Sequence, residues 1–144
     1  MDMSTIYKFA PQMRTYSQLG YEWKTFIMNI QKPRFRSNVV NTDNFGLRFN
    51  NQKIKKSIFD KEEILRNKTG VIVGASTVFG VGASQDQFTI PSYLTDKTDT
   101  HFYNIGGRAY CGFQEIILFN SLINNFNKLE TAVIFSGVND IFMN

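Results

Sequence analysis

Two residue types that carry much protein chemistry are scarce here, because the 144 residues include one cysteine and one histidine. A single cysteine, Cys111, excludes an internal disulfide and any metal site built from several cysteines, and it fits a reducing compartment. No stretch approaches the roughly 20 apolar residues of a membrane span, and the first residues lack the basic-then-apolar order of a secretory signal. We therefore expect a cytoplasmic protein with no membrane partner, no metal and no cofactor.

Charge of either sign is also modest, with 16 Lys and Arg against 12 Asp and Glu, a net charge of +4. Several basic residues fall between Lys32 and Lys68, where they would suit phosphate or an acidic polysaccharide. No recognisable nucleic-acid module accompanies them, so a solvated surface is the favoured interpretation, and we expect no nucleic-acid partner. The 42% of hydrophobic residues is enough for one core in a chain of single-domain length.

The N-terminal third, residues 1–56, predicts an accessory segment rather than a domain, because it offers too little core alone. Apolar residues at helical spacing over 13–30 predict a helix or broken helix, which Pro33 ends, and 39–49 is predicted to be extended with a turn. An aromatic cluster in this region is interpreted as core rather than as a sugar-stacking platform. Its members are Tyr16, Tyr21, Trp23 and Phe26.

From residue 57 onward the pattern alternates between helix and strand. A short helix is predicted to start at Ser57 or Asp60, and later helices at Ile90 and over 113–129. Between them lie three apolar runs, predicted as strands over 71–74, 100–105 and 131–135. This order predicts an α/β domain over 57–144 with a parallel sheet, whose crevice lies at the carboxyl ends of the strands.

Each of the three strands ends in small or polar residues, as a site at that crevice requires. The segments are Gly74-Ala-Ser76, Asn104-Ile-Gly106-Gly-Arg-Ala109 and Gly137-Val-Asn139-Asp140. The first does not fit a nucleotide site, because no Gly-Lys-Ser/Thr follows and the glycine spacing breaks the dinucleotide fingerprint. Nor does Ser76 sit in a Gly-x-Ser-x-Gly elbow, since Val78 takes the last position.

In order and spacing, these segments resemble the first three blocks of the SGNH (GDSL-type) hydrolases, and Gly-Val-Asn-Asp is the most specific of them. The resemblance implies a flavodoxin-like three-layer sandwich and an esterase or acyltransferase acting on an O-acylated carbohydrate or similar ester. It assigns Ser76 as nucleophile and the Asn139 amide, with backbone N–H groups of Ser76 and the second block, as oxyanion donors. The second-block donor would be Ala109, with Gly106 or Gly107 as the fallback.

The chain departs from this family in ways that bear on activity. Gly-Asp-Ser is Gly-Ala-Ser here, and Ala109 stands where many members carry the oxyanion glycine. The family's base is a histidine in a C-terminal Asp-x-x-His element that these residues lack, and His101 precedes a strand instead. Because a serine hydroxyl is a poor nucleophile without a base, we expect an incomplete domain with little or no hydrolase activity alone.

Other interpretations of the same residues stay open. Ser76 is also a plausible helix N-cap, and Asp140 a capping group. Arg108 is equally well placed to bind an anionic substrate or to lie at the surface. The alternative function is a non-catalytic binding or interaction protein that keeps the crevice. An unpaired third strand, 131–135, would favour self-association or complementation by a second chain.

Overall fold

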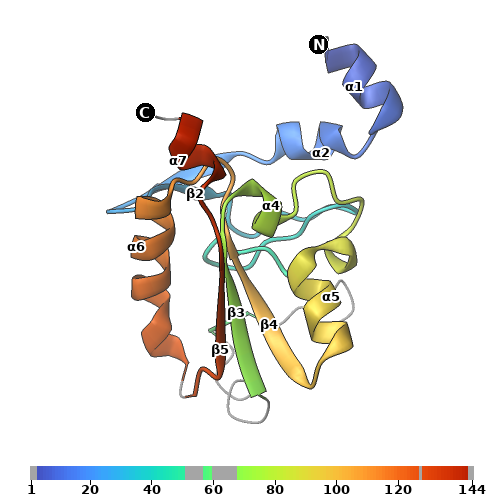
Figure 1. The fold of residues 1–144 in the computed structure, drawn as a ribbon. Coiled ribbons are helices and arrows are strands. Elements are labelled where there is room, and N and C mark those ends of the chain that lie inside the picture. Colours follow the sequence, from blue (N-terminus) through green and yellow to red (C-terminus); the bar gives the residue numbers. More distant parts are fainter. Residues whose placement is uncertain (1–2, 51–56, 60–67, 127, 143–144) are drawn as a thin grey trace.

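A three-stranded parallel sheet of order β4-β3-β5 forms the centre of the computed structural model, which describes residues 3–50, 57–59, 68–126 and 128–142 (Figure 1). The strands are β3 (Lys68–Gly74), β4 (Thr100–Gly106) and β5 (Thr131–Phe135). Both pairings are parallel, so the prediction of a mixed α/β chain with a parallel sheet is confirmed.

Helices lie on both faces of this sheet (Figure 1). Helix α6 (Gly112–Leu122) packs against β3 and β4 on one face, while α4 (Ser76–Phe79) and α5 (Ile90–Lys97) pack on the other. Successive side chains of a strand point to opposite faces. Val71 and Val73 of β3 accordingly join the core under α6, whereas Ile72 joins the core that includes Val78.

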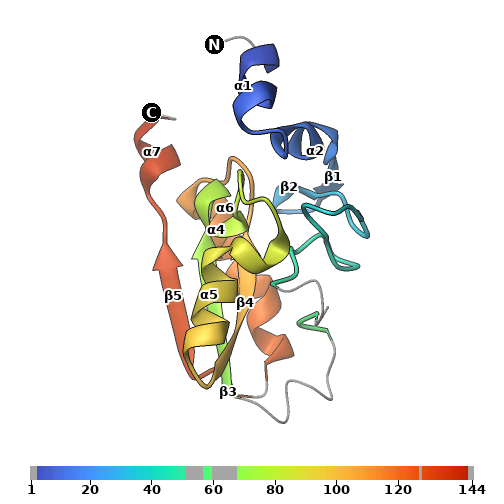
Figure 2. The same ribbon diagram turned by 90° about the vertical axis from the view of Figure 1, so that its right-hand side faces the viewer.

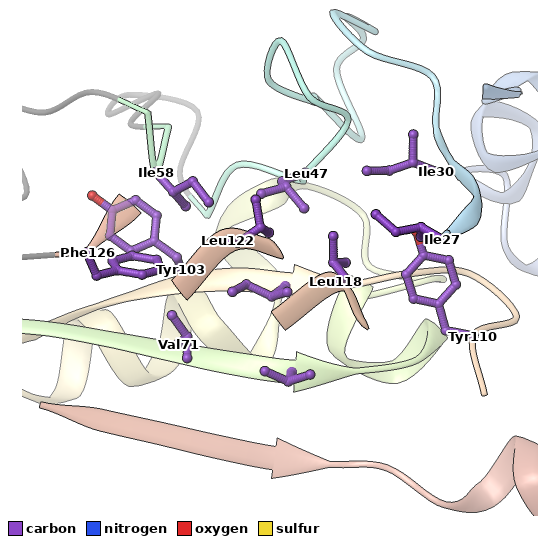
Figure 3. Close-up of a cluster of buried hydrophobic side chains, with 12 residues drawn as sticks. Ile27, Ile30, Leu47, Ile58, Val71, Tyr103, Tyr110, Leu118, Leu122 and Phe126 are labelled. Carbon is purple, nitrogen blue, oxygen red and sulfur yellow. The ribbon is translucent and has the colours of Figure 1, made fainter. Parts of the chain in front are cut away.

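The N-terminal segment packs beside α6, on the β4 side of the sheet, as Figure 3 shows. Leu118 and Leu122 lie between the sheet and this segment, and Ile27, Ile30 and Leu47 belong to the same buried cluster. The segment starts with helices α1 (Met3–Phe9) and α2 (Met13–Gln18) and continues into strands β1 (Tyr21–Lys24) and β2 (Met28–Gln31). Residues 39–49, predicted as extended, hold one isolated bridge, Thr42 to Arg48.

The predicted helix over 13–30 is wrong beyond Gln18, because β1 and β2 form an antiparallel hairpin there. Phe26 and Met28 have φ values of 71° and 68°, which a helix does not contain. The apolar spacing predicts one buried helical face that includes both residues, yet Ile27 is buried and Trp23 is 73% exposed. The interpretation of the aromatic cluster as core therefore holds for Tyr16 alone, since Tyr21, Trp23 and Phe26 are exposed.

The end of one helix in the C-terminal half also differs from prediction. The helix predicted over 113–129 ends at Leu122, where a 3₁₀ turn, η2 (Ile123–Asn125), replaces it, and α7 (Val138–Phe142) follows β5. A second 3₁₀ turn, η1 (Asp86–Phe88), precedes α5, which begins at Ile90 as predicted. The helix predicted from Ser57 or Asp60 lies largely outside the described residues. Among those described, no helix has both the length and the apolarity that a bilayer crossing requires.

Candidate functional site

The three strands end level with one another, which brings the three segments singled out in the sequence to one rim of the sheet. Gly74 pairs with Gly106 of β4 on one side and with Phe135 of β5 on the other. Close approach requires the glycine, because a Cβ at position 74 would lie 2.3 Å from the Phe135 carbonyl oxygen. The rim therefore depends on a residue without a side chain at its centre.

Ser76 and Asn139 line the same pocket at this rim. The pocket has a volume of about 60 Å³, and its walls come from the turn into α4 and the turn from β5 into α7. Ser76 is partly exposed and is the first residue of α4. Its backbone N–H falls in the first turn of that helix, where no partner within the helix exists. The lining residues are Ala75, Ser76, Thr77, Phe135, Ser136, Gly137, Val138 and Asn139.

The side chain of Asn139 is held by the residue that directly follows the second segment. Its Nδ2 donates a hydrogen bond of 2.8 Å to the Tyr110 carbonyl, which leaves the second N–H of the amide for another acceptor. The neighbouring Asp140 carboxylate accepts from the Gly112 N–H at 2.9 and 3.1 Å, at the start of α6. Asp140 thus caps backbone, the role that the sequence left open for it.

The second segment contains three candidate oxyanion donors, and hydrogen bonds distinguish among them. Gly106 N–H donates to Asn104 Oδ1 at 3.0 Å, and Gly107 N–H donates to the Gly74 carbonyl at 3.0 Å. The N–H groups of both fallback residues therefore already donate hydrogen bonds within the protein. Ala109 has φ of 61°, a left-handed conformation that favours glycine.

Arg108 faces the N-terminal segment and is absent from the pocket lining. Its guanidinium donates to Gln31 Oε1 at 2.5 Å and to the carbonyl of Tyr16 at 2.7 Å, and it also bonds the Leu19 carbonyl. Its carbon CZ lies 4.2 Å from the centroid of the Tyr21 ring. Burial lowers the pKa of this guanidinium. Arg108 therefore links the hairpin region to the second segment through hydrogen bonds.

His101 and Cys111 lie apart from the pocket lining. His101 stands near the start of β4, in register with Thr69, and its ring meets Tyr103 edge-on at 4.6 Å. Gly106 lies five positions further along the strand, a distance of about 16 Å. Cys111 precedes α6 as its N-cap residue and is partly buried.

A buried ion pair that the sequence did not reveal supports the turn after α4. Arg48 donates to Asp86 Oδ1 at 2.8 Å with neither side chain exposed, and also to the Phe79 and Gly80 carbonyls at 3.1 and 2.8 Å. The Tyr16 hydroxyl accepts from Arg48 and donates to the Gly80 carbonyl, and burial raises its pKa. No sequence motif signals a contact between residues 38 positions apart.

Compared with known proteins, the chain matches no family model and no curated sequence.

Proposed function

We propose that the pocket at the sheet rim is a serine esterase or acyltransferase site of the SGNH type, in a flavodoxin-like layered domain, acting on an O-acylated carbohydrate or a similar ester. The observation that supports this most is the placement of Ser76 and Asn139 on one pocket at the carboxyl ends of β3 and β5. A hydroxyl and an amide donor at one rim are the two groups that acyl transfer to serine needs.

The reaction would run in two steps. Ser76 Oγ loses its proton to a base and bonds to the acyl carbon, and the carbonyl oxygen becomes an oxyanion. The free N–H of Asn139, with the backbone N–H groups of Ser76 and Ala109, would donate to that oxyanion. The carbon–oxygen bond to the alcohol then breaks and the alcohol takes up the proton. Water or a second hydroxyl removes the acyl group from Ser76 by the same sequence.

None of the described residues places a histidine base at the pocket, since the one histidine of the sequence lies at the far end of β4. We propose that this chain alone turns over esters poorly, and that a histidine from another polypeptide segment would complete the site. The position of His101 equally favours a second candidate, a cytoplasmic binding protein that keeps the crevice without the chemistry.

An added base separates the two candidates. The purified chain would be assayed with p-nitrophenyl acetate, with and without imidazole, beside Ser76→Ala and the exposed-serine control Ser84→Ala. The esterase proposal expects no Ser76-dependent turnover alone, and turnover above the imidazole background that disappears in Ser76→Ala but not in Ser84→Ala. Identical rates for the wild type and Ser76→Ala at every imidazole concentration would favour the binding protein.

A further inference from the structure

A second cavity lies between α6 and β5, on the face of the sheet that α6 covers. Its volume is about 140 Å³ and its walls are aliphatic or aromatic apart from three residues. Helix α6 packs on β3 and β4, so it leaves the β5 side of this face open, and Ile134 there is 73% exposed. The lining residues are Val73, Gly112, Glu115, Ile116, Phe119, Ala132, Ile134 and Ser136.

One carboxylate in this cavity has an oxygen atom without a hydrogen-bond partner. Glu115 is 2% exposed, and its Oε1 accepts no hydrogen bond, although the Ser136 side chain bonds the same carboxyl group. Burial, and the nearby Asp140 carboxylate, raise the Glu115 pKa. A buried carboxylate oxygen without a donor costs free energy, and the cavity lining contains no cation to offset it.

The cavity adjoins a strand with an unpaired edge. β5 pairs with β3 on one side, and no described strand lies beyond its other edge, along one side of the molecule in Figure 2. Its sequence, Thr-Ala-Val-Ile-Phe, has none of the lysines, prolines or bulges that usually protect an edge. Ala132 and Ile134 of this strand also line the cavity, so a strand added at the edge would place alternate side chains directly over it.

We propose that the edge of β5 binds an extended peptide segment of a partner protein, and that a lysine of this segment inserts into the cavity to reach Glu115. The four methylene groups of lysine suit the apolar walls, and its ammonium supplies the donor that Oε1 lacks. Backbone hydrogen bonds to β5 would give affinity and the lysine specificity, as in other cases of strand addition.

A second copy of this chain fits the surface less well. Antiparallel pairing of two β5 strands would satisfy their backbone groups, but β5 contains no basic residue, so each Glu115 would stay without a cation. Charge complementarity therefore favours a lysine-bearing partner over self-association. The proposal is independent of the esterase chemistry, because it uses neither Ser76 nor Asn139.

Two blocked peptides test it, Ac-Thr-Val-Lys-Val-Thr-NH2 and the same peptide with norleucine in place of lysine. Each would be titrated into the ¹⁵N-labelled chain and followed by NMR at low salt. We expect shifts of β5 amides and of the α6 amides near Glu115, and an affinity at least about tenfold higher for the lysine peptide, since a charge-assisted bond in an apolar site is worth that much. Equal affinities in the unaltered chain, or shifts confined to other surfaces, would overturn the proposal.

Substitutions locate the effect. Glu115→Gln keeps the shape and should remove the preference for lysine over norleucine, whereas the exposed-carboxylate control Glu22→Gln should keep it. Ser76→Ala should bind both peptides like the wild type, whatever the fate of the esterase proposal. A lysine preference that survives Glu115→Gln would contradict the assignment, and so would dimers formed through β5 that the lysine peptide does not displace.

Discussion

The guanidinium of Arg48 and the carboxylate of Asp86 form an ion pair of 2.8 Å in the interior, with no exposed surface on either side chain. Asp86 also accepts from the backbone N–H and Nδ2 of Asn41, at 3.1 and 2.7 Å. Through Arg48 this pair bonds the two carbonyls at the end of α4, the helix that begins at Ser76. The N-terminal segment is thereby part of the scaffold of the site.

Removing one partner of this pair should be far more costly than removing both. Arg48→Met leaves a buried carboxylate without its cation, and we expect a loss of about 3–5 kcal/mol in the free energy of unfolding. In the double variant Arg48→Met/Asp86→Leu the loss should be about 1–3 kcal/mol smaller than the sum of the two single losses. Urea denaturation of the four proteins measures this coupling, and strictly additive losses would show that the pair does not act as a unit.

Two neighbouring positions in the second segment should respond oppositely to changes between alanine and glycine. Ala109→Gly relieves a left-handed φ of 61° and should raise the free energy of unfolding by up to about 1 kcal/mol. Gly107→Ala should destabilise the chain by more than about 2 kcal/mol, because its Cβ would lie 2.1 Å from the buried Tyr110 ring. Thermal unfolding compares the two, and destabilisation by Ala109→Gly would contradict the assigned strain.

Exposure predicts different costs for two aromatic residues that the sequence grouped together. Trp23→Ala should change the free energy of unfolding by less than about 1 kcal/mol, because the side chain is 73% exposed. Tyr16→Ala should cost about 3–5 kcal/mol, because the ring is buried and its hydroxyl bonds the Gly80 and Ala83 carbonyls. A large loss on Trp23→Ala would mean that the hairpin packs differently.

The carboxyl group of Glu115 should make stability depend on pH. Its pKa is raised by burial in the folded state, so the unfolded chain loses this proton first as pH rises. The group therefore costs stability above its unfolded pKa, near 4.3, and costs none well below it. Glu115→Gln should consequently gain stability relative to the wild type as pH rises from about 4 to 7, measured by urea unfolding across that range. A difference that is constant or shrinks with rising pH would contradict the raised pKa.

The central sheet and the rim of the site could be predicted from sequence because buried parallel strands are continuous apolar runs. The runs ending at Gly74 and Gly106 are mostly buried, and the run ending at Phe135 has the same apolar composition although most of it is exposed. Their parallel pairing follows from the helices between them. The meeting of Ser76 and Asn139 at one pocket then needs only that the strands end level, as they do.

The features that escaped prediction depend on contacts between distant residues or on backbone conformations that apolar spacing does not encode. The positive φ values at Phe26 and Met28 form a hairpin from a pattern typical of a helix. Arg48 pairs with Asp86, 38 positions away, and Arg108 bonds Leu19, 89 positions away. Neither contact can be predicted from the residues next to it in the sequence. The unpaired oxygen of Glu115 likewise depends on tertiary packing, because α6 leaves the β5 side of the sheet uncovered.

The joint action of Ser76 and Asn139 is tested most directly by the acetylation of Ser76. The chain would be incubated with p-nitrophenyl acetate and imidazole, and the acetylated residues would be mapped by mass spectrometry. We expect an acetyl group on Ser76 that forms about 10²–10³ times more slowly in Asn139→Ala, since that change removes one oxyanion donor. Thermal unfolding of the variant checks that loss of its bond to Tyr110 leaves it folded. Acetylation of other residues in preference to Ser76, or an unchanged rate in a folded Asn139→Ala variant, would contradict the account.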